Sequence, residues 1–422
     1  MKTSRFFVWL SLLATTLLSG CGDSNNNTPM VFPTGLTVTN FQKASVAIGQ
    51  ATFTAYSSST SARATTAHSN DGSYGSPLIH NGILYLSDFY ANRVLGYNSV
   101  PTTNGASADF VLGQADLVSS GPGTSASMLN GPGSVRYANG KFFVTDYYNN
   151  RILIWNTPPT TTGVAADVVV GKADFTSSNC TSGSAGLCFP DDMFVVGTKL
   201  IVADTVNNRV LIWNTIPATS GVPADVVLGQ GDFTLVTQND DDQDGIADVT
   251  PSNRTLQNPV GIWSDGTKLI VCDFGNNRVL IWNTFPTANF AAANVVLGQN
   301  DFTLYAENDD NQDGIADPTP SARTLFFPYY VTSNGSKLFV ADANNHRVLM
   351  WDTIPTSNFA TASKVLGQAT FTANTPNDDN QDGISDATPT ARTLYYPTGV
   401  YIFDRKLFVS DNSNSRFLIF NF

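Results

Sequence analysis

Three acidic segments carry the side chains best suited to chemistry, with the sequences NDDDQDGIAD (239–248), NDDNQDGIAD (308–317) and NDDNQDGISD (377–386). Counted from the second residue of each segment, positions 1, 3 and 5 are Asp or Asn and position 6 is Gly. A tight turn at the glycine can aim these oxygens at one point, and Ca²⁺ prefers hard oxygen ligands. The spacing therefore predicts three calcium sites; a solvated acidic turn without metal is the simpler alternative.

The expected ligands include a backbone carbonyl at position 7 and a further Asp at position 9. The full set is Asp240, Asp242, Asp244, Ile246 and Asp248; Asp309, Asn311, Asp313, Ile315 and Asp317; and Asp378, Asn380, Asp382, Ile384 and Asp386. Position 12, where an EF-hand has a bidentate Glu, is Pro251, Pro320 or Pro389. The segments resemble the shorter DxDxDG loops of dockerin and thrombospondin type 3 repeats, so a further ligand must come from elsewhere or from water.

These segments lie within a repeat in which an Asp is followed five residues later by an Arg and then, four residues on, by an aromatic. The copies are Asp88/Arg93/Tyr97, Asp146/Arg151/Trp155, Asp204/Arg209/Trp213, Asp273/Arg278/Trp282, Asp342/Arg347/Trp351 and Asp411/Arg416/Phe420. The steps between arginines are 58, 58, 69, 69 and 69 residues, so the last three units are longer by the acidic segments. Six equivalent copies favour a structural ion pair and a packing aromatic over catalysis.

One unit, residues 258–299, predicts four short strands at 260–263, 268–273, 278–282 and 294–299. The second strand is apolar on both faces, which is typical of a sheet packed between two other sheets, as in a β-propeller blade. A Gly-Gln strand at 44–50 precedes the first unit, and none follows the last. The sequence therefore predicts an all-β, six-bladed propeller of four-stranded antiparallel blades over 44–422, closed by the N-terminal strand completing the last blade.

The segment DFGNNRVLIW (273–282) resembles the NHL repeat, and all six units keep its Asp and Arg. The resemblance covers residues 44–422 and implies the same six-bladed propeller. The units are longer than those of the family, with extended linkers between blades. In such a blade the turn between the second and third strands and the exit of the fourth share one face, so the acidic segments should lie on the face of these turns.

The N-terminus has the features of a bacterial export signal. Lys2 and Arg5 precede an apolar run at 6–18 that is too short to span a membrane comfortably. The sequence Leu-Ser-Gly-Cys ending at Cys21 resembles a lipobox, which implies a signal peptide at 1–20, lipidation of Cys21 and anchoring in the bacterial cell envelope. Gly22 favours the outer membrane, and residues 21–43 should be a flexible tether. An ordinary signal with a chance cysteine is the alternative.

The remaining residues exclude several classes of function. With 22 Lys and Arg, a net charge of −12 and no basic cluster, nucleic-acid binding is not expected. His68, His80 and His346 lack metal-ligand spacing, and no nucleophile elbow, phosphate loop or dinucleotide fingerprint occurs. We expect a disulfide between Cys180 and Cys188 in an oxidising compartment, and a buried apolar role for Cys272.

Aromatic residues cluster at the entries of the last two blades, and they either pack in the blades or line the channel mouth as a ligand site. They are Phe327, Tyr329, Tyr330, Tyr395 and Tyr396. The expected function is a monomeric, surface-tethered, non-enzymatic binding or scaffold propeller that takes a protein or glycan on its loop face, with calcium ordering the loops of blades 4–6. The alternatives are an extracytoplasmic lyase or lactone hydrolase that uses carboxylates at the channel mouth, and a structural envelope protein.

Overall fold

The computed structural model describes residues 38–56 and 74–422 and confirms the predicted six-bladed β-propeller. The expected signal peptide at 1–20, the lipidation site Cys21, the first part of the tether and His68 lie outside these residues. In the described part of the chain, none of the helices combines the length and apolarity needed to cross a bilayer.

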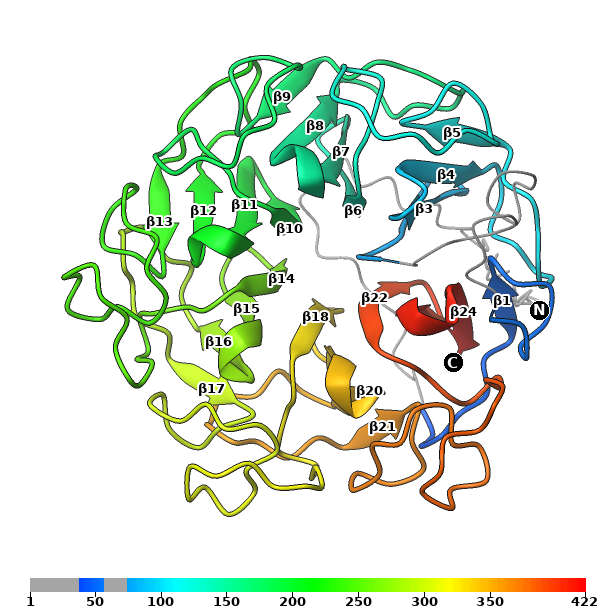
Figure 1. Cartoon of the computed structure of the whole chain (residues 1–422), viewed down its shortest axis with the longest axis vertical. Helices are drawn as coiled ribbons and strands as arrows, with labels where there is room; N and C mark the ends of the chain where they lie inside the picture. Colours follow the sequence, from blue (N-terminus) through cyan, green and yellow to red (C-terminus); the bar gives the residue numbers. More distant parts are fainter. Residues whose placement is uncertain (1–37, 57–73) are drawn as a thin grey trace, which may run out of the picture.

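Each of the first three blades runs from an inner strand to an outer one in chain order (Figure 1). Blade 1 contains β2 (Leu78–His80), β3 (Ile83–Asp88), β4 (Arg93–Tyr97) and β5 (Phe110–Leu112). Blade 2 contains β6 (Pro132–Ala138), β7 (Lys141–Asp146), β8 (Arg151–Trp155) and β9 (Val168–Val170). Blade 3 contains β10 (Pro190–Val196), β11 (Lys199–Asp204), β12 (Arg209–Trp213) and β13 (Val226–Leu228).

The second half of the ring follows the same order until its last strand. Blade 4 contains β14 (Pro259–Ser264), β15 (Leu269–Asp273), β16 (Arg278–Trp282) and β17 (Val295–Leu297). Blade 5 contains β18 (Pro328–Ser333), β19 (Leu338–Asp342), β20 (Arg347–Trp351) and β21 (Lys364–Leu366). Blade 6 contains β22 (Pro397–Phe403), β23 (Lys406–Asp411), β24 (Arg416–Asn421) and β1 (Val46–Ile48).

A short 3-10 turn joins the second and third strands of blades 2–6. These turns are η1 (Tyr147–Asn149), η2 (Thr205–Asn207), η3 (Phe274–Asn276), η4 (Ala343–Asn345) and η5 (Asn412–Asn414). Each ends at a left-handed residue directly before the Arg, which is Asn150, Asn208, Asn277, His346 or Ser415. Asn tolerates the left-handed conformation, which explains why Asn often precedes Arg in the repeat sequence.

The ring closes through the N-terminal strand, as the Gly-Gln pattern predicts. β1 pairs antiparallel with β24, with Val46 opposite Ile419 and Ile48 opposite Phe417. Ser45 also donates its backbone N–H to Ile419 O at 2.7 Å. The first and last described strands therefore complete one sheet, and blade 6 has no open outer edge.

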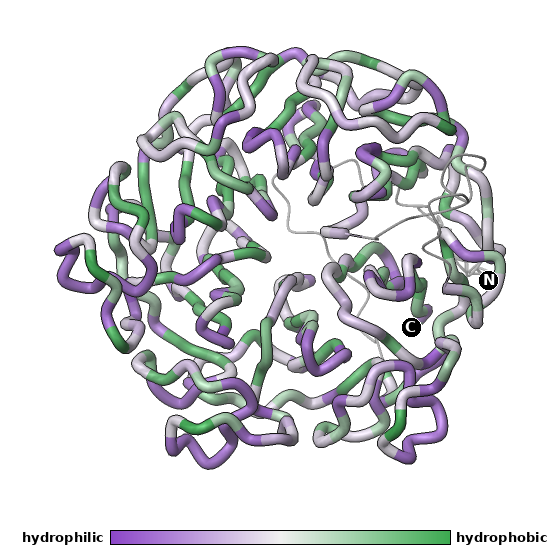
Figure 2. The backbone as a smooth tube through the Cα atoms, in the orientation of Figure 1, coloured by the Kyte–Doolittle hydropathy of each residue, from purple (hydrophilic) through white to green (hydrophobic). Residues whose placement is uncertain are grey.

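The core lies between the blades, and Figure 2 shows the strands coloured largely hydrophobic. In β15, Ile270 and Cys272 pack toward blade 5, whereas Leu269 and Val271 pack toward blade 3. The central strand is therefore buried on both faces, as its unbroken apolar run predicts. Cys272 is a free thiol with no exposed surface, whereas Cys180 and Cys188 form a disulfide with a Cα–Cα distance of 4.4 Å.

Candidate functional site

The six Asp/Arg pairs are buried structural ties. In every copy Arg Nε contacts Asp Oδ2 at 2.7 Å, and neither side chain is exposed. In blade 4, Arg278 Nη2 donates to the carbonyls of Ser252 (2.9 Å) and Thr255 (3.1 Å), and Nη1 donates to Phe302 O. Since Ser252 and Phe302 lie in the linkers entering and leaving blade 4, this pair fixes one turn to two linkers and is not free to contact a substrate.

The three acidic segments, called the acidic loops, lie at the outer edge of adjacent blades (Figure 1). In the first, ligand atoms of Asp240, Asp242 and Asp244 lie within 4.8 Å of one another. Asp240 is buried and accepts hydrogen bonds from the backbone N–H groups of Asp244 (3.1 Å) and Gly245 (2.9 Å). Asp309 and Asp378 bind Gly314 (2.8 Å) and Gly383 (2.9 Å) in the same way. The glycine turn therefore gathers the oxygens as its spacing predicts.

The other predicted ligands are placed around the same turn. Asp248 Oδ2 accepts the backbone N–H of Asp241 at 2.8 Å, which holds position 9 beside the start of the loop. Asp317 and Asp386 do the same for Asp310 (3.0 Å) and Asp379 (2.8 Å). Position 7 is expected to offer its backbone carbonyl oxygen. The isoleucines at this position are 69–70% exposed (Ile246, Ile315, Ile384). The donor set consists of oxygens alone, which fits Ca²⁺.

Each acidic loop is fixed to its own linker. Asp241 accepts hydrogen bonds from Arg254 Nη2 (2.9 Å) and Ser252 Oγ (2.6 Å). Gln243 accepts the backbone N–H of Gly231 and donates to Asp240 O. The same ion pairs join Asp310 to Arg323 (3.0 Å) and Asp379 to Arg392 (2.9 Å). These contacts hold the loop backbone close to the blade while leaving the side chains at positions 3 and 5 exposed to solvent.

Reciprocal amide pairs connect the acidic loops to the structural ties. Asn239 and Asn276 each donate to the other's side-chain oxygen at 2.9 Å, and Asn276 also donates to Asp273 Oδ2 at 2.8 Å. The pairs Asn308/Asn345 and Asn377/Asn414 repeat this arrangement. The acidic loops therefore share a face with the Asn-Asn-Arg turns and are linked through the turn Asn to the Asp of the following blade.

A buried amide oxygen accompanies each acidic loop. The Oε1 atoms of Gln230, Gln299 and Gln368 are buried without a hydrogen-bond partner. The Gln230 amide N–H groups are used, since Nε2 donates to Asn208 O (3.1 Å) and Thr237 O (2.8 Å). Thr237 in turn donates its hydroxyl to Gly245 O of the loop at 3.2 Å. Each of the three longer linkers thus has a buried oxygen acceptor without a hydrogen-bond partner. Water, or the hydration shell of a cation, would satisfy it.

Two acidic residues that repeat spacing does not mark, Asp191 and Asp192, lie at the centre of the ring. They occupy a β-bulge of β10, because Pro190 pairs with Asp204 and Met193 with Val202. A bulge changes the direction in which side chains point. Here it lies at the start of β10, the innermost strand of blade 3. Asp191 is 2% exposed and Asp192 is 0% exposed. A pair of adjacent buried carboxyls requires specific compensation.

Asp192 is compensated by a hub network that joins blades across the axis. Its Oδ1 accepts from Arg136 Nη2 (3.1 Å) and Tyr330 OH (3.0 Å). Its Oδ2 accepts from the backbone N–H of Ile262 at 2.8 Å. Tyr330 of blade 5 also lies 3.3 Å from Ser134 Oγ of blade 2 and contacts Arg136. Burial raises the Asp192 pKa, and Arg136 opposes this shift.

Asp191 lies nearer the loop face, and only one of its two carboxyl oxygens has hydrogen-bond partners. Its Oδ2 accepts from Tyr329 OH at 2.7 Å and Tyr74 OH at 3.3 Å. Its Oδ1 is buried and has no hydrogen-bond partner. Burial raises the pKa of Asp191 well above its ordinary value, and the neighbouring Asp192 raises it further. The resulting neutral carboxyl can donate a hydrogen bond, or ionise if a cation reaches it.

Eight rings, together called the aromatic collar, contact one another in two groups that meet at Tyr74 and Tyr329, the two side chains bonded to Asp191. They come from all six blades: Tyr74, Phe89, Tyr147, Phe189, Phe274, Phe327, Tyr329 and Tyr396. Tyr74 stacks on Phe89 at 4.2 Å and meets Tyr329 edge-on at 5.4 Å. Burial, together with the Asp191 carboxylate, raises the pKa of Tyr396 to about 12.

The predicted aromatic residues do not form one group. Phe327, Tyr329 and Tyr396 belong to the aromatic collar, whereas Tyr330 lies deeper in the hub network. Tyr395 is 39% exposed, and its ring lies against His346 at 5.1 Å. Burial of His346 lowers its pKa to about 4. Its Nδ1 accepts a hydrogen bond from the backbone N–H of Tyr396. His80 stacks on Tyr137 at 3.6 Å.

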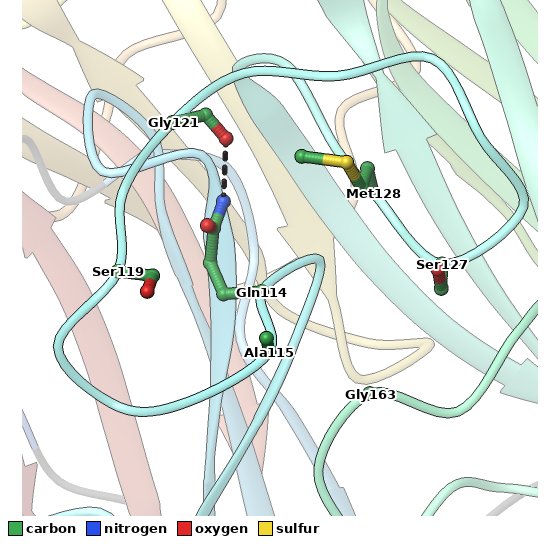
Figure 3. A pocket seen from close by; sticks show the side chains of 7 residues that line it. All are labelled: Gln114, Ala115, Ser119, Gly121, Ser127, Met128 and Gly163. Atoms are coloured by element: carbon green, nitrogen blue, oxygen red, sulfur yellow. Dashed lines mark hydrogen bonds between the residues drawn. The ribbon is translucent and has the colours of Figure 1, made fainter.

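A hollow of about 520 Å³ lies between blades 1 and 2 at the outer rim (Figure 3). Its lining includes Gln114, Met128 and Gly163, and Gln114 donates to Gly121 O at 2.9 Å. The lining residue Ala115 corresponds to Gly231, to which Gln243 of an acidic loop binds. In the longer linkers, a side chain of the acidic loop therefore contacts the position that lines the hollow here.

Several solved structures resemble this fold at low sequence identity. A virginiamycin B lyase from Staphylococcus aureus is 12% identical, with a TM-score of 0.43, covering 85% of this chain and 97% of the lyase chain. An inactive variant of that lyase with quinupristin gives 13% identity, a TM-score of 0.41 and coverage of 83% and 95%. A chain of a nidogen/laminin complex gives 15% identity, a TM-score of 0.36 and coverage of 70% and 82%.

No protein-family description matches the chain, and no curated protein matches it. Likeness at this level to the lyase and nidogen structures supports no conclusion about ligand or activity. The functional assignment therefore depends on the residues of this chain.

Proposed function

We propose that this protein is a non-enzymatic binding propeller, tethered to the bacterial envelope through Cys21, that presents a calcium-ordered loop face to a protein or glycan partner. The observation that carries the proposal is the threefold acidic loop. Three adjacent blades hold the same oxygen donors with the same anchoring contacts, on the face of the Asn-Asn-Arg turns. The linkers of the units whose repeat arginines are 58 residues apart lack the insertion.

Calcium would be held by the carboxylate and amide oxygens at positions 1, 3, 5 and 9 and by the carbonyl at position 7. It would neutralise carboxylates whose mutual repulsion otherwise disfavours a compact loop. The reciprocal pair of Asn239 with Asn276 then transmits the fixed loop position to the blade, because Asn276 also contacts Asp273. An ordered loop face reduces the entropy lost when a partner binds.

A second candidate is an extracytoplasmic lyase or lactone hydrolase with its site at the channel mouth. It is supported by Asp191, whose raised pKa is suited to a general acid beside Tyr329. Turnover in a screen of lactones and polysaccharides, lost in Asp191→Asn, would establish it in place of the binding function.

Calcium should stabilise the protein and protect residues 239–258, 308–327 and 377–396 from proteolysis. Loops of this kind in extracellular modules have Kd values of about 10⁻⁴–10⁻³ M. At ten times Kd, each site would add about 1.4 kcal/mol to the free energy of unfolding. Thermal melts and limited proteolysis in calcium, in magnesium at equal ionic strength and in chelator measure the effect.

The variant Asp240→Asn/Asp309→Asn/Asp378→Asn should lose this response, since each substitution removes one charged ligand. Asp265→Asn is the matched control, because Asp265 is an exposed residue of the β14–β15 turn that only caps backbone N–H groups. Unchanged melting and proteolysis of the wild-type protein in calcium would refute the calcium sites. Binding to glycan arrays and purified envelope proteins, compared with and without chelator, tests the partner class.

A further inference from the structure

The centre of the loop face has a binding group that the calcium loops do not explain. Asp191 is 2% exposed, and its Oδ1 has no hydrogen-bond partner. Its other oxygen is fixed by Tyr329 at 2.7 Å and Tyr74 at 3.3 Å, so the carboxyl is held in one orientation. A buried polar atom without a partner costs about 1–3 kcal/mol, and a fold retains it where a ligand or water supplies the missing bond.

The groups around Asp191 are aromatic. The collar rings form a continuous chain of contacts, from Phe189 through Tyr147 and Phe89 to Tyr74 (5.1, 5.7 and 4.2 Å between centroids). It continues from Tyr74 through Tyr329 to Phe274 (5.4 and 5.5 Å). Aromatic faces carry negative potential and attract organic cations, most strongly where water is excluded.

The charges near the axis select the sign of the ligand. The one basic group of the hub network, Arg136, is engaged by Asp192 and Tyr330. Across residues 38–56 and 74–422, no Lys or Arg lies over a collar ring. An anion would meet two carboxyls, and a neutral polyol would gain nothing from the ring faces beyond contact. A cation gains from both the carboxylate and the rings.

We infer that Asp191 and the aromatic collar form a site for a small organic ammonium ion with an apolar or aromatic body. The ammonium group donates to Asp191 Oδ1, and the body packs against the rings of Tyr74, Phe89 and Tyr329. This site lies on the propeller axis and uses no residue of the acidic loops, so it is independent of the proposed calcium-dependent face.

Isothermal titration of the purified protein with 2-phenylethylammonium chloride tests the site, with 2-phenylethanol as the neutral analogue of the same shape. The amine should bind at least about tenfold more tightly than the alcohol, a difference of about 1.4 kcal/mol. Asp191→Asn should remove this preference, because it keeps the side-chain shape but cannot become an anion. Asp265→Asn, which removes an exposed carboxylate at the opposite end of blade 4, should retain it.

Equal binding of amine and alcohol, or an amine affinity unchanged in Asp191→Asn, would overturn the inference. Asp191-dependent binding of N-acetylglucosamine without amine binding would also overturn it, in favour of a neutral sugar site. If Asp191→Asn fails to fold, Phe89→Leu and a crystal structure of the wild-type protein with the amine take its place; the nitrogen must lie within hydrogen-bond distance of Asp191 Oδ1. Repeating the titration in chelator separates this site from the calcium sites, since its affinity should not change.

Discussion

Replacing Arg278 by methionine is expected to lower the free energy of unfolding by about 3–5 kcal/mol. The substitution leaves the Asp273 carboxylate in a site with no exposed surface and removes its 2.7 Å partner. It also strands the carbonyls of Ser252 and Thr255, to which the guanidinium donates. Urea denaturation followed by tryptophan fluorescence measures the loss, because Trp282 lies at the other end of the same strand.

Arg254→Met is the matched control for this prediction. Arg254 also pairs with an aspartate, at 2.9 Å from Asp241, but the two side chains are 42% and 36% exposed. Exposed ion pairs contribute about 0–1 kcal/mol, so this variant should unfold close to the wild-type urea concentration. Adding Asp273→Asn to Arg278→Met should recover part of the loss, since the buried charge is then removed. Equal effects of the two arginine substitutions would contradict a structural role for the buried pairs.

The sequence was sufficient to predict the number of blades and the closure of the ring. Six copies of one Asp-to-Arg spacing set the number of blades, and the early Gly-Gln strand had no other place than the outer edge of blade 6. The spacing is informative because each Arg must reach its Asp across a short turn, which in blades 2–6 is a 3-10 turn. Local geometry of this kind repeats with the chain and is therefore visible in it.

The acidic loops were equally visible, because their oxygens come from residues close in sequence. The anchors that position them were less so. Asn239 meets Asn276 from 37 residues away, and Gln230 holds its amide beside the loop through bonds to backbone carbonyls. Such contacts depend on how one blade stacks on the next, and a pattern of residue types does not report them.

The hub could not be predicted in this way. Asp191 and Tyr329 lie 138 residues apart, and only the curvature of the ring brings them together. A weaker signal was present in the repeat. The two residues after the entry proline are Gly133-Ser134, Asp191-Asp192, Val260-Gly261, Tyr329-Tyr330 and Thr398-Gly399 in blades 2–6, and blade 3 alone has charges there. A charged pair at a position that is uncharged in the four equivalent blades indicates a local function.

The second large effect is expected at this hub, where Arg136→Met should destabilise the protein by about 3–5 kcal/mol at pH 7. Arg136 is the cation bound to Asp192, at 3.1 Å, and Asp191 lies next to it in the chain. Without the arginine, two adjacent buried carboxyls have no compensating charge. Arg405→Met, which removes an exposed arginine from the β22–β23 turn, should have little effect.

The deficit of Arg136→Met should depend on pH with a defined sign. Burial already holds the Asp192 pKa above its unfolded value of about 3.9, and loss of Arg136 raises it further. The native state then binds a proton more tightly than the unfolded state, so stability falls as pH rises from the unfolded pKa to the folded pKa. The gap between variant and wild type should therefore be largest at pH 7 and narrow toward pH 4, which urea midpoints at both pH values measure. A gap of equal size at both would show that Arg136 contributes packing alone and that the hub carries no charge that needs compensation.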